Sequence, residues 1–308
     1  MDTEERKNIL VITLSNIGDV VLTTPVICSL RALFPGAKFT VVVGPKAAPL
    51  LQGSRLIDRV LIYNKWSGLG HKLKLVRELR EEFYDWVVDL KNTGIPYLVR
   101  ASRRSPFLRR YRAKPARERH LEVLRMMKLP VLNSISFDFF SESDEQSLAA
   151  KLKRKEFGLL APWGVVAPGA GSEAKRWPVE GFREVVDRLI HTTPVSLAVV
   201  GDAGESRLGV PLAQVDPMRV VNLAGELTLR ELGALVGRAR IVLTNDSAVM
   251  HLGYELHRPV VALFGPTDPE KYGRENKIWR IVREAPPARF EDLRPEKVFS
   301  ACETLLRT

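Results

Sequence analysis

The sequence predicts an α/β protein built from two doubly wound domains, each with a parallel β-sheet. Short apolar runs rich in β-branched residues alternate with stretches of helical periodicity in both halves of the chain. Several of these runs end in polar turns that contain Gly or Ser, as strands do at the ligand-binding edge of an open parallel sheet. With 308 residues, 45% of them hydrophobic, the chain is long enough to bury two cores.

The first half contains the pattern strand, loop, helix more than once. In order, we expect a strand at 8–14, a loop at 15–19, a helix at 20–33, strands at 39–43 and 59–62, a helix at 72–82 and a strand at 86–90. The periodicity fails over residues 103–119, where we expect loops or an insertion, and helices are predicted at 119–127 and 143–155. Alternation of this kind favours right-handed βαβ units.

The second half repeats the alternation after a candidate boundary at 160–164. The predicted domains are therefore residues 1–160 and 161–308. Strands are expected at 165–167, 196–200, 220–221, 241–243 and 260–264, and helices at 179–191, 205–214, 228–237 and 247–256. The last predicted helix, 295–306, has no strand of its own, and we expect it to pack back on the first domain.

The positive charge is concentrated in the first half of the chain. The net charge is +11, and residues 1–150 carry 24 Lys and Arg against 16 Asp and Glu. Residues 101–128 alone hold 10 basic and 2 acidic residues. This patch indicates an anionic partner or, equally, a solvated basic face. Nucleic acid is disfavoured because no recognition-helix signature or aromatic–basic interleaving accompanies the charge. The residues that define the patch are Arg103, Arg104, Arg109, Arg110, Arg112 and Lys114.

The chain reads as a cytoplasmic protein without a structural metal. No apolar run is long enough to span a bilayer, and the N-terminal residues do not resemble a signal peptide. The two cysteines, Cys28 and Cys302, are far apart and form no C-x-x-C motif. No His, Cys or Asp cluster has metal-ligand spacing, so neither a metal nor another cofactor is expected.

Four strand-end loops carry candidate chemistry. They are residues 15–19 with Gly18 and Asp19, 168–178 with Ser172 and Lys175, 201–205 with Glu205, and 244–251 with Asp246, Ser247, Ala248 and His251. The strand at 260–264 adds Gly265 and Thr267. A helix that starts at residue 247 would offer free N–H groups to an anion, so a phosphate-bearing ligand is predicted there.

Each of these residues also has a purely structural interpretation. Asp19 can cap its helix, Glu205 can belong to a plain turn, and His251 can be a buried structural histidine. The first loop has one Gly where a dinucleotide-binding fingerprint has three, and the 168–178 loop is not a Walker A motif. Dinucleotide binding and P-loop ATP hydrolysis are therefore disfavoured.

Taken together, the segments 9–25, 168–178, 244–251 and 264–267 resemble glycosyltransferase family 9, the heptosyltransferases of lipopolysaccharide core assembly. Their order and separation match the family across nearly the whole chain. The resemblance implies the GT-B architecture, in which two Rossmann-like domains face a cleft. It also implies an inverting, metal-independent transfer from a nucleotide-sugar, usually ADP-L-glycero-β-D-manno-heptose, to a Kdo or heptose of the lipid A inner core.

The resemblance assigns roles to individual residues. Asp19 looks like the general base, and Lys175 looks like the group that contacts the donor diphosphate. The donor-binding set would be Gly18, Ser172, Lys175, Glu205, Asp246, Ser247, Ala248, His251, Gly265 and Thr267, with Glu205 on the ribose. Ala248 departs from the Gly usual in the family. The anionic acceptor would meet the basic patch, which implies peripheral attachment to the cytoplasmic face of the inner membrane.

Two other functions are compatible with parts of this pattern. One is a non-catalytic protein of the same fold that binds a nucleotide-sugar or an anionic glycan. The other is a glycosyltransferase that uses a different nucleotide-sugar. A retained base at Asp19 favours an enzyme, because a pure binding protein needs none.

Overall fold

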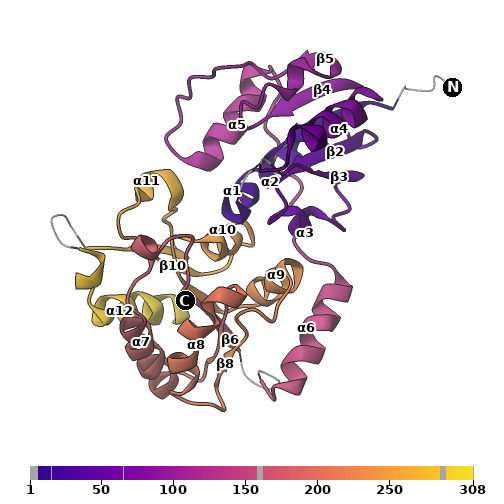
Figure 1. The fold of residues 1–308 in the computed structure, drawn as a ribbon. Helices are drawn as coiled ribbons and strands as arrows, with labels where there is room; N and C mark the ends of the chain where they lie inside the picture. Colours follow the sequence, from indigo (N-terminus) through magenta and orange to yellow (C-terminus); the bar gives the residue numbers. More distant parts are fainter. Residues whose placement is uncertain (1–5, 15, 65, 158–161, 285–288, 308) are drawn as a thin grey trace. The chain divides into compact units, whose positions relative to one another are not determined.

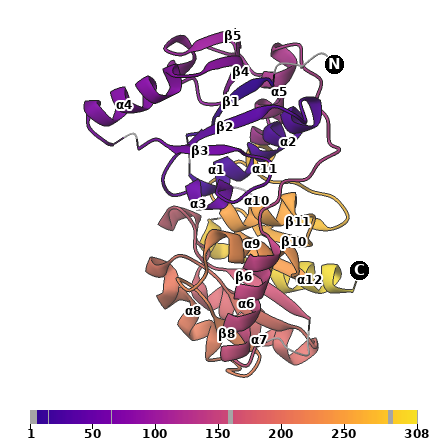
Figure 2. The same ribbon diagram turned by 90° about the vertical axis from the view of Figure 1, so that its right-hand side faces the viewer.

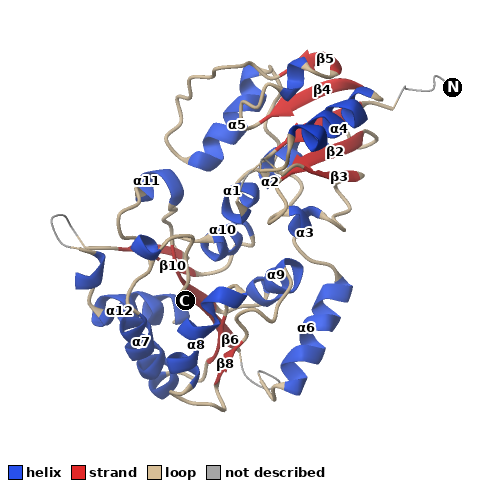
Figure 3. Cartoon of the chain, viewed as in Figure 1, coloured by secondary structure: helices blue, strands red, loops and turns tan. Residues whose placement is uncertain are grey.

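The computed structural model describes the chain except for residues 1–5, 15, 65, 158–161, 285–288 and 308. The chain forms two compact units, unit 1 (Met1–Phe139) and unit 2 (Phe140–Thr308). In each unit a parallel sheet has helices on both faces (Figures 1 and 3). The predicted α/β class with two doubly wound domains is therefore confirmed.

Unit 1 contains five parallel strands in the order β3-β2-β1-β4-β5. Its strands are β1 (Asn8–Ile12), β2 (Lys38–Val43), β3 (Arg59–Ile62), β4 (Phe83–Asp89) and β5 (Arg100–Arg104). Its helices are α1 (Ile17–Val21), α2 (Thr24–Leu33), α3 (Ala48–Leu51), α4 (Leu69–Arg80), the 3-10 turn η1 (Ile95–Tyr97) and α5 (Ala116–Met126). Leu75 and Leu79 of α4 and Ile95 of η1 share one apolar cluster with strands β1 to β4, while α2 and α5 pack against each other.

Unit 2 contains six parallel strands in the order β11-β10-β9-β6-β7-β8. Its strands are β6 (Trp163–Ala167), β7 (Ser196–Val199), β8 (Val220–Asn222), β9 (Ile241–Asn245), β10 (Val260–Leu263) and β11 (Trp279–Val282). Its helices are α6 (Glu142–Arg154), α7 (Val179–Thr192), α8 (Ser206–Ala213), α9 (Leu229–Gly237), α10 (Ala248–Glu255), α11 (Pro269–Tyr272) and α12 (Pro295–Leu306), with 3-10 turns η2 (Glu173–Lys175), η3 (Ala203–Glu205) and η4 (Phe290–Asp292).

The strand order places a topological switch point in each sheet. In unit 1 the chain starts at β1, moves to β2 and β3 on one side, and then returns to β4 and β5 on the other. Unit 2 does the same around β6 and β9. In open α/β sheets the crevice outside the carboxyl ends of the strands at such a point is where ligands bind. The loops after β1 and β4, and those after β6 and β9, are therefore the ones to examine.

Several elements differ from the sequence-based expectation. The helix predicted at 20–33 is two helices, because Pro25 lacks a backbone N–H and the Thr23 and Thr24 hydroxyls bond to the Val20 and Val21 carbonyls at 2.7 and 2.8 Å. The region predicted as loops begins with the edge strand β5, which is rich in arginine and so does not read as a strand.

The last part of the chain also needs correction. Strand β11 was not predicted, since only Val282 of its residues is buried. It pairs with β10 and supplies the strand that the last helix was thought to lack. Val298, Cys302 and Leu305 of α12 lie in the core cluster of unit 2, so the prediction that this helix packs on the first domain is wrong.

The boundary between the units falls earlier than the predicted one. The expected boundary after residue 160 lies outside the described residues, whereas the compact units divide after Phe139. Helix α6 accounts for the difference, because it packs against α9 of unit 2. Lys151 and Ser147 of α6 both bond to the buried Glu231 carboxylate, at 2.7 and 2.6 Å.

Candidate active site

The switch point of unit 1 brings together acidic and basic side chains from three separate segments. Asp19 lies in the first turn of α1, directly after the loop that follows β1. Lys91 follows β4, and its Nζ lies 3.4 Å from Oδ2 of Asp19. Both side chains are partly exposed. Asp19 makes no side-chain cap of α1, whose N-cap residue is Asn16, but it is an acid in the first turn, so its structural interpretation holds as a first-turn acid and not as a cap.

Backbone bonds to Asp89 fix the position of Lys91. The Asp89 carboxylate accepts hydrogen bonds from the backbone N–H groups of Lys91 and Thr93, at 2.8 and 2.6 Å, and from the Thr93 hydroxyl at 2.9 Å. The guanidinium of Arg109 donates from Nη1 to the Asp89 carbonyl oxygen. The turn after β4 is thus tied together at four points, which holds Lys91 next to Asp19.

His120 of α5 completes this group and is buried. Burial, together with the positive charges of Lys91 and Arg109, lowers the pKa of His120 to about 4 against the opposing effect of Asp19. The imidazole is therefore neutral at physiological pH. Within the described part of the chain, Nδ1 of His120 and both Nε and Nη2 of Arg109 are buried without a hydrogen-bond partner. A polar ligand or an ordered water bound beside this switch point would supply the hydrogen bonds that these buried atoms lack.

The switch point of unit 2 also pairs a lysine with an aspartate, but here the aspartate is nearly buried. Lys175 of η2 follows β6, and its Nζ donates to Oδ2 of Asp246 at 2.8 Å. Asp246 follows β9 and its side chain is only 5% exposed, while that of Lys175 is 31% exposed. The ammonium of Lys175 also lies 5.6 Å from the centroid of the Tyr272 ring. Lys175 and Asp246, which the family resemblance assigns to donor binding, are thus in direct contact.

The loop after β9 is held from both sides. Nδ2 of Asn245 donates to the Pro168 carbonyl at 2.8 Å, and its Oδ1 accepts from the Trp177 backbone N–H at 3.2 Å. These two bonds clamp the start and the end of the 168–178 loop onto β9. The Ser247 hydroxyl caps α10 by accepting from the Val249 N–H at 3.2 Å. One of the helix N–H groups expected to meet a phosphate is thus already bonded to the cap.

The remaining predicted donor residues have diverse surroundings. Ser172 is the exposed N-cap of η2, Ala248 begins α10, and Gly18 precedes Asp19 in α1 of unit 1. His251 is buried, with its ring 6.2 Å from that of Tyr272. Thr267 lies after β10, and its buried Oγ1 has no hydrogen-bond partner among the described residues. Of this set, Thr267 has the side-chain hydroxyl that is best placed to bond to a ligand hydroxyl or phosphate oxygen.

Two predicted residues also have structural roles. The Glu205 carboxylate forms a capping box with Asp202 and pairs with Arg176 at 3.3 Å. A Cβ on Gly169 would come within 2.1 Å of that carboxylate, so Glu205 covers the Gly169 backbone closely. A Cβ on Gly265 would meet the Phe290 ring at 2.4 Å. A side chain at position 265 would therefore require Phe290 to shift, and one at position 169 would require the Glu205 carboxylate to shift, independently of any ligand.

Only some residues of the predicted basic patch are exposed. Arg104 donates to the carbonyls of Pro96 and Val99 at 2.7 and 3.1 Å, and Arg109 is directed to Asp89, so both guanidinium groups act within the fold. Arg103 stacks on the Trp86 ring at 4.7 Å from the centroid. The exposed members are Arg103, Arg110, Arg112 and Lys114.

Sequence reasoning missed four residues of these two groups. Lys91, Asp89 and His120 belong to unit 1, and Tyr272 belongs to unit 2. The polar residues 91–93 directly after the strand predicted at 86–90 were the available signal for Lys91, and Asp89 lies near the end of that strand. His120 and Tyr272 follow no strand, and only the packing of α5 and α11 brings them to the switch points. Among the described residues, no group of three or more His, Cys, Asp or Glu side chains is arranged to hold a metal ion.

Comparison with known proteins agrees with the chemistry of these groups. Residues 72–297 match the family described as glycosyltransferase family 9 (heptosyltransferase). The chain is 26% identical to lipooligosaccharide heptosyltransferase 2 of Haemophilus influenzae, covering 85% of this chain and 84% of that protein. It is 29% identical to lipopolysaccharide heptosyltransferase 3 of Escherichia coli, covering 82% and 81% respectively.

Solved structures with this fold include members of the same family. A family 9 glycosyltransferase from Veillonella parvula superposes with a TM-score of 0.84 at 22% identity, covering 99% of both chains. The ADP-heptose lipopolysaccharide heptosyltransferase II of Escherichia coli superposes with a TM-score of 0.80 at 23% identity, covering 97% of this chain and 98% of that one. The two parallel-sheet α/β domains are thus those of the GT-B class. The chain belongs to glycosyltransferase family 9 and is a glycosyltransferase of the heptosyltransferase type.

Proposed function

We propose that this enzyme transfers a heptose from ADP-L-glycero-β-D-manno-heptose to a Kdo or heptose of the lipopolysaccharide inner core, with inversion and without a metal ion. One observation carries the proposal. The switch point of unit 1 presents a partly exposed carboxylate, Asp19, and the switch point of unit 2 presents a cation, Lys175. Glycosyl transfer needs both groups, a base for the acceptor hydroxyl and a positive charge for the leaving diphosphate.

Asp19 is the proposed general base. The acceptor hydroxyl attacks the anomeric carbon of the donor while its proton passes to the carboxylate, and the bond from that carbon to the ADP oxygen breaks. Lys91 approaches Oδ2 of Asp19, so Oδ1 is the oxygen we assign to the proton. Attack from the side opposite to ADP inverts the anomeric centre, which yields an α-linkage from a β-linked donor.

Lys175 is the proposed partner of the departing ADP. An ammonium group has three N–H donors, so Lys175 can keep its bond to Asp246 and still contact a phosphate oxygen. Asp246 holds the ammonium in place, so no side-chain ordering is needed at the moment of reaction. The N-terminus of α10 adds the positive end of a helix dipole. Fixed charge of this kind takes the part that a divalent ion plays in other nucleotide-sugar enzymes.

Other residues after the unit 2 strands are assigned to donor binding. Thr267 offers its unsatisfied hydroxyl, and Ser172 and Ser247 line the same edge of the sheet. We assign the donor ribose to Glu205, whose pairing with Arg176 leaves the carboxylate at the carboxyl end of β7. No cofactor takes part in this proposal.

The acceptor of this reaction is anionic and anchored in lipid. We therefore propose that the enzyme works as a cytoplasmic protein bound peripherally to the inner membrane. None of the helices in the described part of the chain is long and apolar enough to cross a bilayer. The exposed residues Arg103, Arg110, Arg112 and Lys114 supply positive charge for the acceptor.

The test is a turnover assay with Asp19→Asn. ADP release is measured with ADP-heptose and a truncated lipid A acceptor, with and without EDTA, and the product linkage is read by NMR. We expect Asp19→Asn to lower turnover by roughly 10²–10⁴-fold and to leave the affinity for ADP unchanged. EDTA should have no effect. Near-normal turnover of the variant would refute the base assignment, and absence of ADP release with every nucleotide-sugar would refute the function itself.

A further inference from the structure

Exposed apolar side chains are concentrated in unit 1. In the part of the chain that the structure describes, nine large apolar side chains of unit 1 are exposed, against two in unit 2. The nine are Ile62, Trp66, Leu69, Leu73, Phe83, Tyr97, Leu98, Phe107 and Leu108, and the two are Val210 and Met218. Tyr97 and Phe107 cover each other partly, because their rings meet edge to face at 6.0 Å. The most exposed group that remains together lies at the start of α4.

Helix α4 turns an apolar face away from its own core. Leu75 and Leu79 are buried against the sheet, whereas Leu69 and Leu73, which are four residues apart and so share a face, are 71% and 61% exposed. Trp66, just before the helix, is 83% exposed. At 100° per residue, the face that carries Leu69 and Leu73 is turned by about 120° from the face that carries Leu75 and Leu79.

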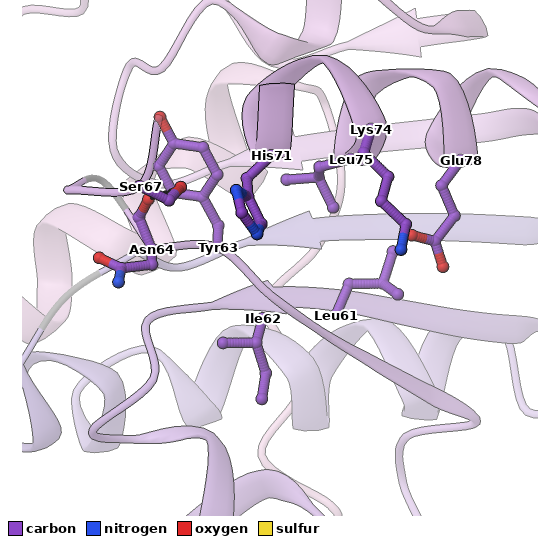
Figure 4. A pocket seen from close by; sticks show the side chains of 9 residues that line it. All are labelled: Leu61, Ile62, Tyr63, Asn64, Ser67, His71, Lys74, Leu75 and Glu78. Carbon is purple, nitrogen blue, oxygen red and sulfur yellow. Dashed lines mark hydrogen bonds between the residues drawn. The ribbon is translucent and has the colours of Figure 1, made fainter. Parts of the chain in front are cut away.

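The first turns of α4 stand away from the sheet. No residue of α4 before Leu75 is buried, and Figure 2 shows this end of the helix extending beyond the strands of unit 1. A pocket of about 480 Å³ lies between β3 and the helix, lined among others by Leu61, Tyr63, His71 and Lys74 (Figure 4). The exposed leucines therefore lie in a segment of the helix that contributes no buried side chain to the core of unit 1.

The charges of α4 complement an anionic surface. Lys72, Lys74, Arg77 and Arg80 accompany the exposed leucines, and Glu78 is the acidic residue of the helix. Glu78 is already paired with Arg59 of β3. A helix that combines basic residues with exposed Leu and an adjacent Trp is typical of segments that lie in the interface of an anionic bilayer, where Trp prefers the headgroup level.

We propose that Trp66 and the first turns of α4 form an interfacial membrane anchor that inserts Trp66, Leu69 and Leu73 among anionic phospholipids. Lys74, Arg77 and Arg80 bind the headgroup phosphates around them. This inference rests on the proposed function only in that a lipid-anchored acceptor requires an enzyme at the membrane. It differs from the basic patch of residues 103–114, which has its own exposed apolar residues, Phe107 and Leu108, and includes no side chain of α4.

Vesicle binding of the full chain tests the anchor without donor or acceptor, so a chain without transferase activity would still give a result. Binding is measured by co-sedimentation with phosphatidylcholine vesicles that contain phosphatidylglycerol, and with phosphatidylcholine alone. Trp66 emission provides a second readout, since Trp66 is the most exposed of the five tryptophans, with Trp86 and Trp177 buried and Trp163 and Trp279 partly buried. We expect binding to the anionic vesicles, a blue shift, and quenching by brominated lipids, with the quenching reduced in Trp66→Phe.

A triple variant identifies the residues that insert. We expect Trp66→Ser with Leu69→Gln and Leu73→Gln to lower the vesicle partition coefficient by about tenfold or more, since each side chain loses apolar burial. The matched control, Val210→Gln with Met218→Gln, removes two exposed apolar side chains of unit 2 and should bind as the unaltered chain does. Lys74→Gln with Arg77→Gln should weaken binding in a manner that salt mimics.

Three results would overturn the proposal. The first is failure of the unaltered chain to bind anionic vesicles, and the second is normal binding of the triple variant. The third is loss of binding in Arg110→Gln with Arg112→Gln while the triple variant binds normally, which would assign the membrane to the basic patch. If ultracentrifugation showed that the α4 residues mediate self-association and no lipid contact, the occupant of this face would be a second copy of the chain.

Discussion

Replacement of Lys175 by methionine separates the structural from the catalytic role of a single ion pair. Met has nearly the volume of the Lys stem but no charge, so the change removes the 2.8 Å bond to Asp246 and little else. Asp246 then remains as a nearly buried carboxylate without its cation, since its side chain is only 5% exposed. A buried charge that loses its partner destabilises the fold.

The two effects have different sizes. Loss of a charged hydrogen bond to a buried carboxylate costs about 1.5–3 kcal/mol of unfolding free energy, at the lower end because Lys175 is partly solvated. Loss of a fixed charge at the leaving group costs roughly 10²–10³-fold in turnover. Addition of Asp246→Asn removes the unpaired charge, so the double variant should recover at least half of the lost stability. It should recover none of the lost turnover, because no cation has returned.

Unit 2 offers a matched control in Lys151→Met. Lys151 lies 2.7 Å from Glu231, with side chains 25% and 4% exposed, which closely matches the geometry and burial of the Lys175–Asp246 pair. This pair joins α6 to α9. Lys151 also donates to the Glu226 carbonyl in the loop after β8, but it is not part of the loops after β6 and β9. Lys151→Met should therefore cost similar stability and leave kcat unchanged.

The assay combines denaturant unfolding, followed by tryptophan fluorescence, with ADP release at saturating donor. Equal losses of turnover in Lys175→Met and Lys151→Met would show that the catalytic defect merely follows instability. Full recovery of turnover in Lys175→Met with Asp246→Asn would likewise refute the role of the Lys175 charge. Either result would leave the pair as a structural contact.

Two further predictions concern acid stability and the Gly169 contact. The pKa of His120 is lowered to about 4 in the folded chain, so the unfolded chain binds one more proton between that value and 6.5, and stability falls as pH decreases through this window. His120→Gln should remove up to roughly 3 kcal/mol of that decline, measured as the difference between the two unfolding curves, and parallel curves would contradict the prediction. Gly169→Ala should displace the Glu205 carboxylate and destabilise unit 2 by about 1–3 kcal/mol, whereas Gly171→Ala, whose Cβ meets nothing within 4 Å, should be nearly neutral in unfolding experiments. Equal stabilities of these two glycine variants would mean that Glu205 moves aside at no cost.

The sequence predicts the buried strands and the edge strands β3 and β8, and it misses the edge strands β5 and β11, for a physical reason. Strands β1, β2, β9 and β10 are covered on both faces, so their residues are continuously apolar and their ends are marked by polar turns. Edge strands β5 and β11 have fewer buried residues, and their Arg and Trp side chains follow no simple period. The split between α1 and α2 was also missed, because threonine bonds to the preceding turn do not show in an apolar pattern.

Strand order explains which parts of the site a sequence can predict. A strand-end residue such as Asp19, Lys175 or Asp246 is visible as a polar break after an apolar run. Which breaks meet depends on which strands are neighbours. Lys175 and Asp246 are 71 residues apart and touch only because β6 pairs with β9, and Asp19 meets Lys91 only because β1 pairs with β4. Family resemblance supplied the first pairing and not the second.

The two ion pairs also differ in how accessible their carboxylates are to a substrate, and this difference follows from burial. Asp246 is nearly buried and its carboxylate holds Lys175, so it is poorly accessible to a substrate hydroxyl. Asp19 is more exposed and its contact with Lys91 is longer, at 3.4 Å, so a carboxylate oxygen can reach an incoming hydroxyl. The same pair of residue types at two switch points thus gives a fixed cation in one unit and an accessible carboxylate in the other, which are the two groups that the proposed transfer requires.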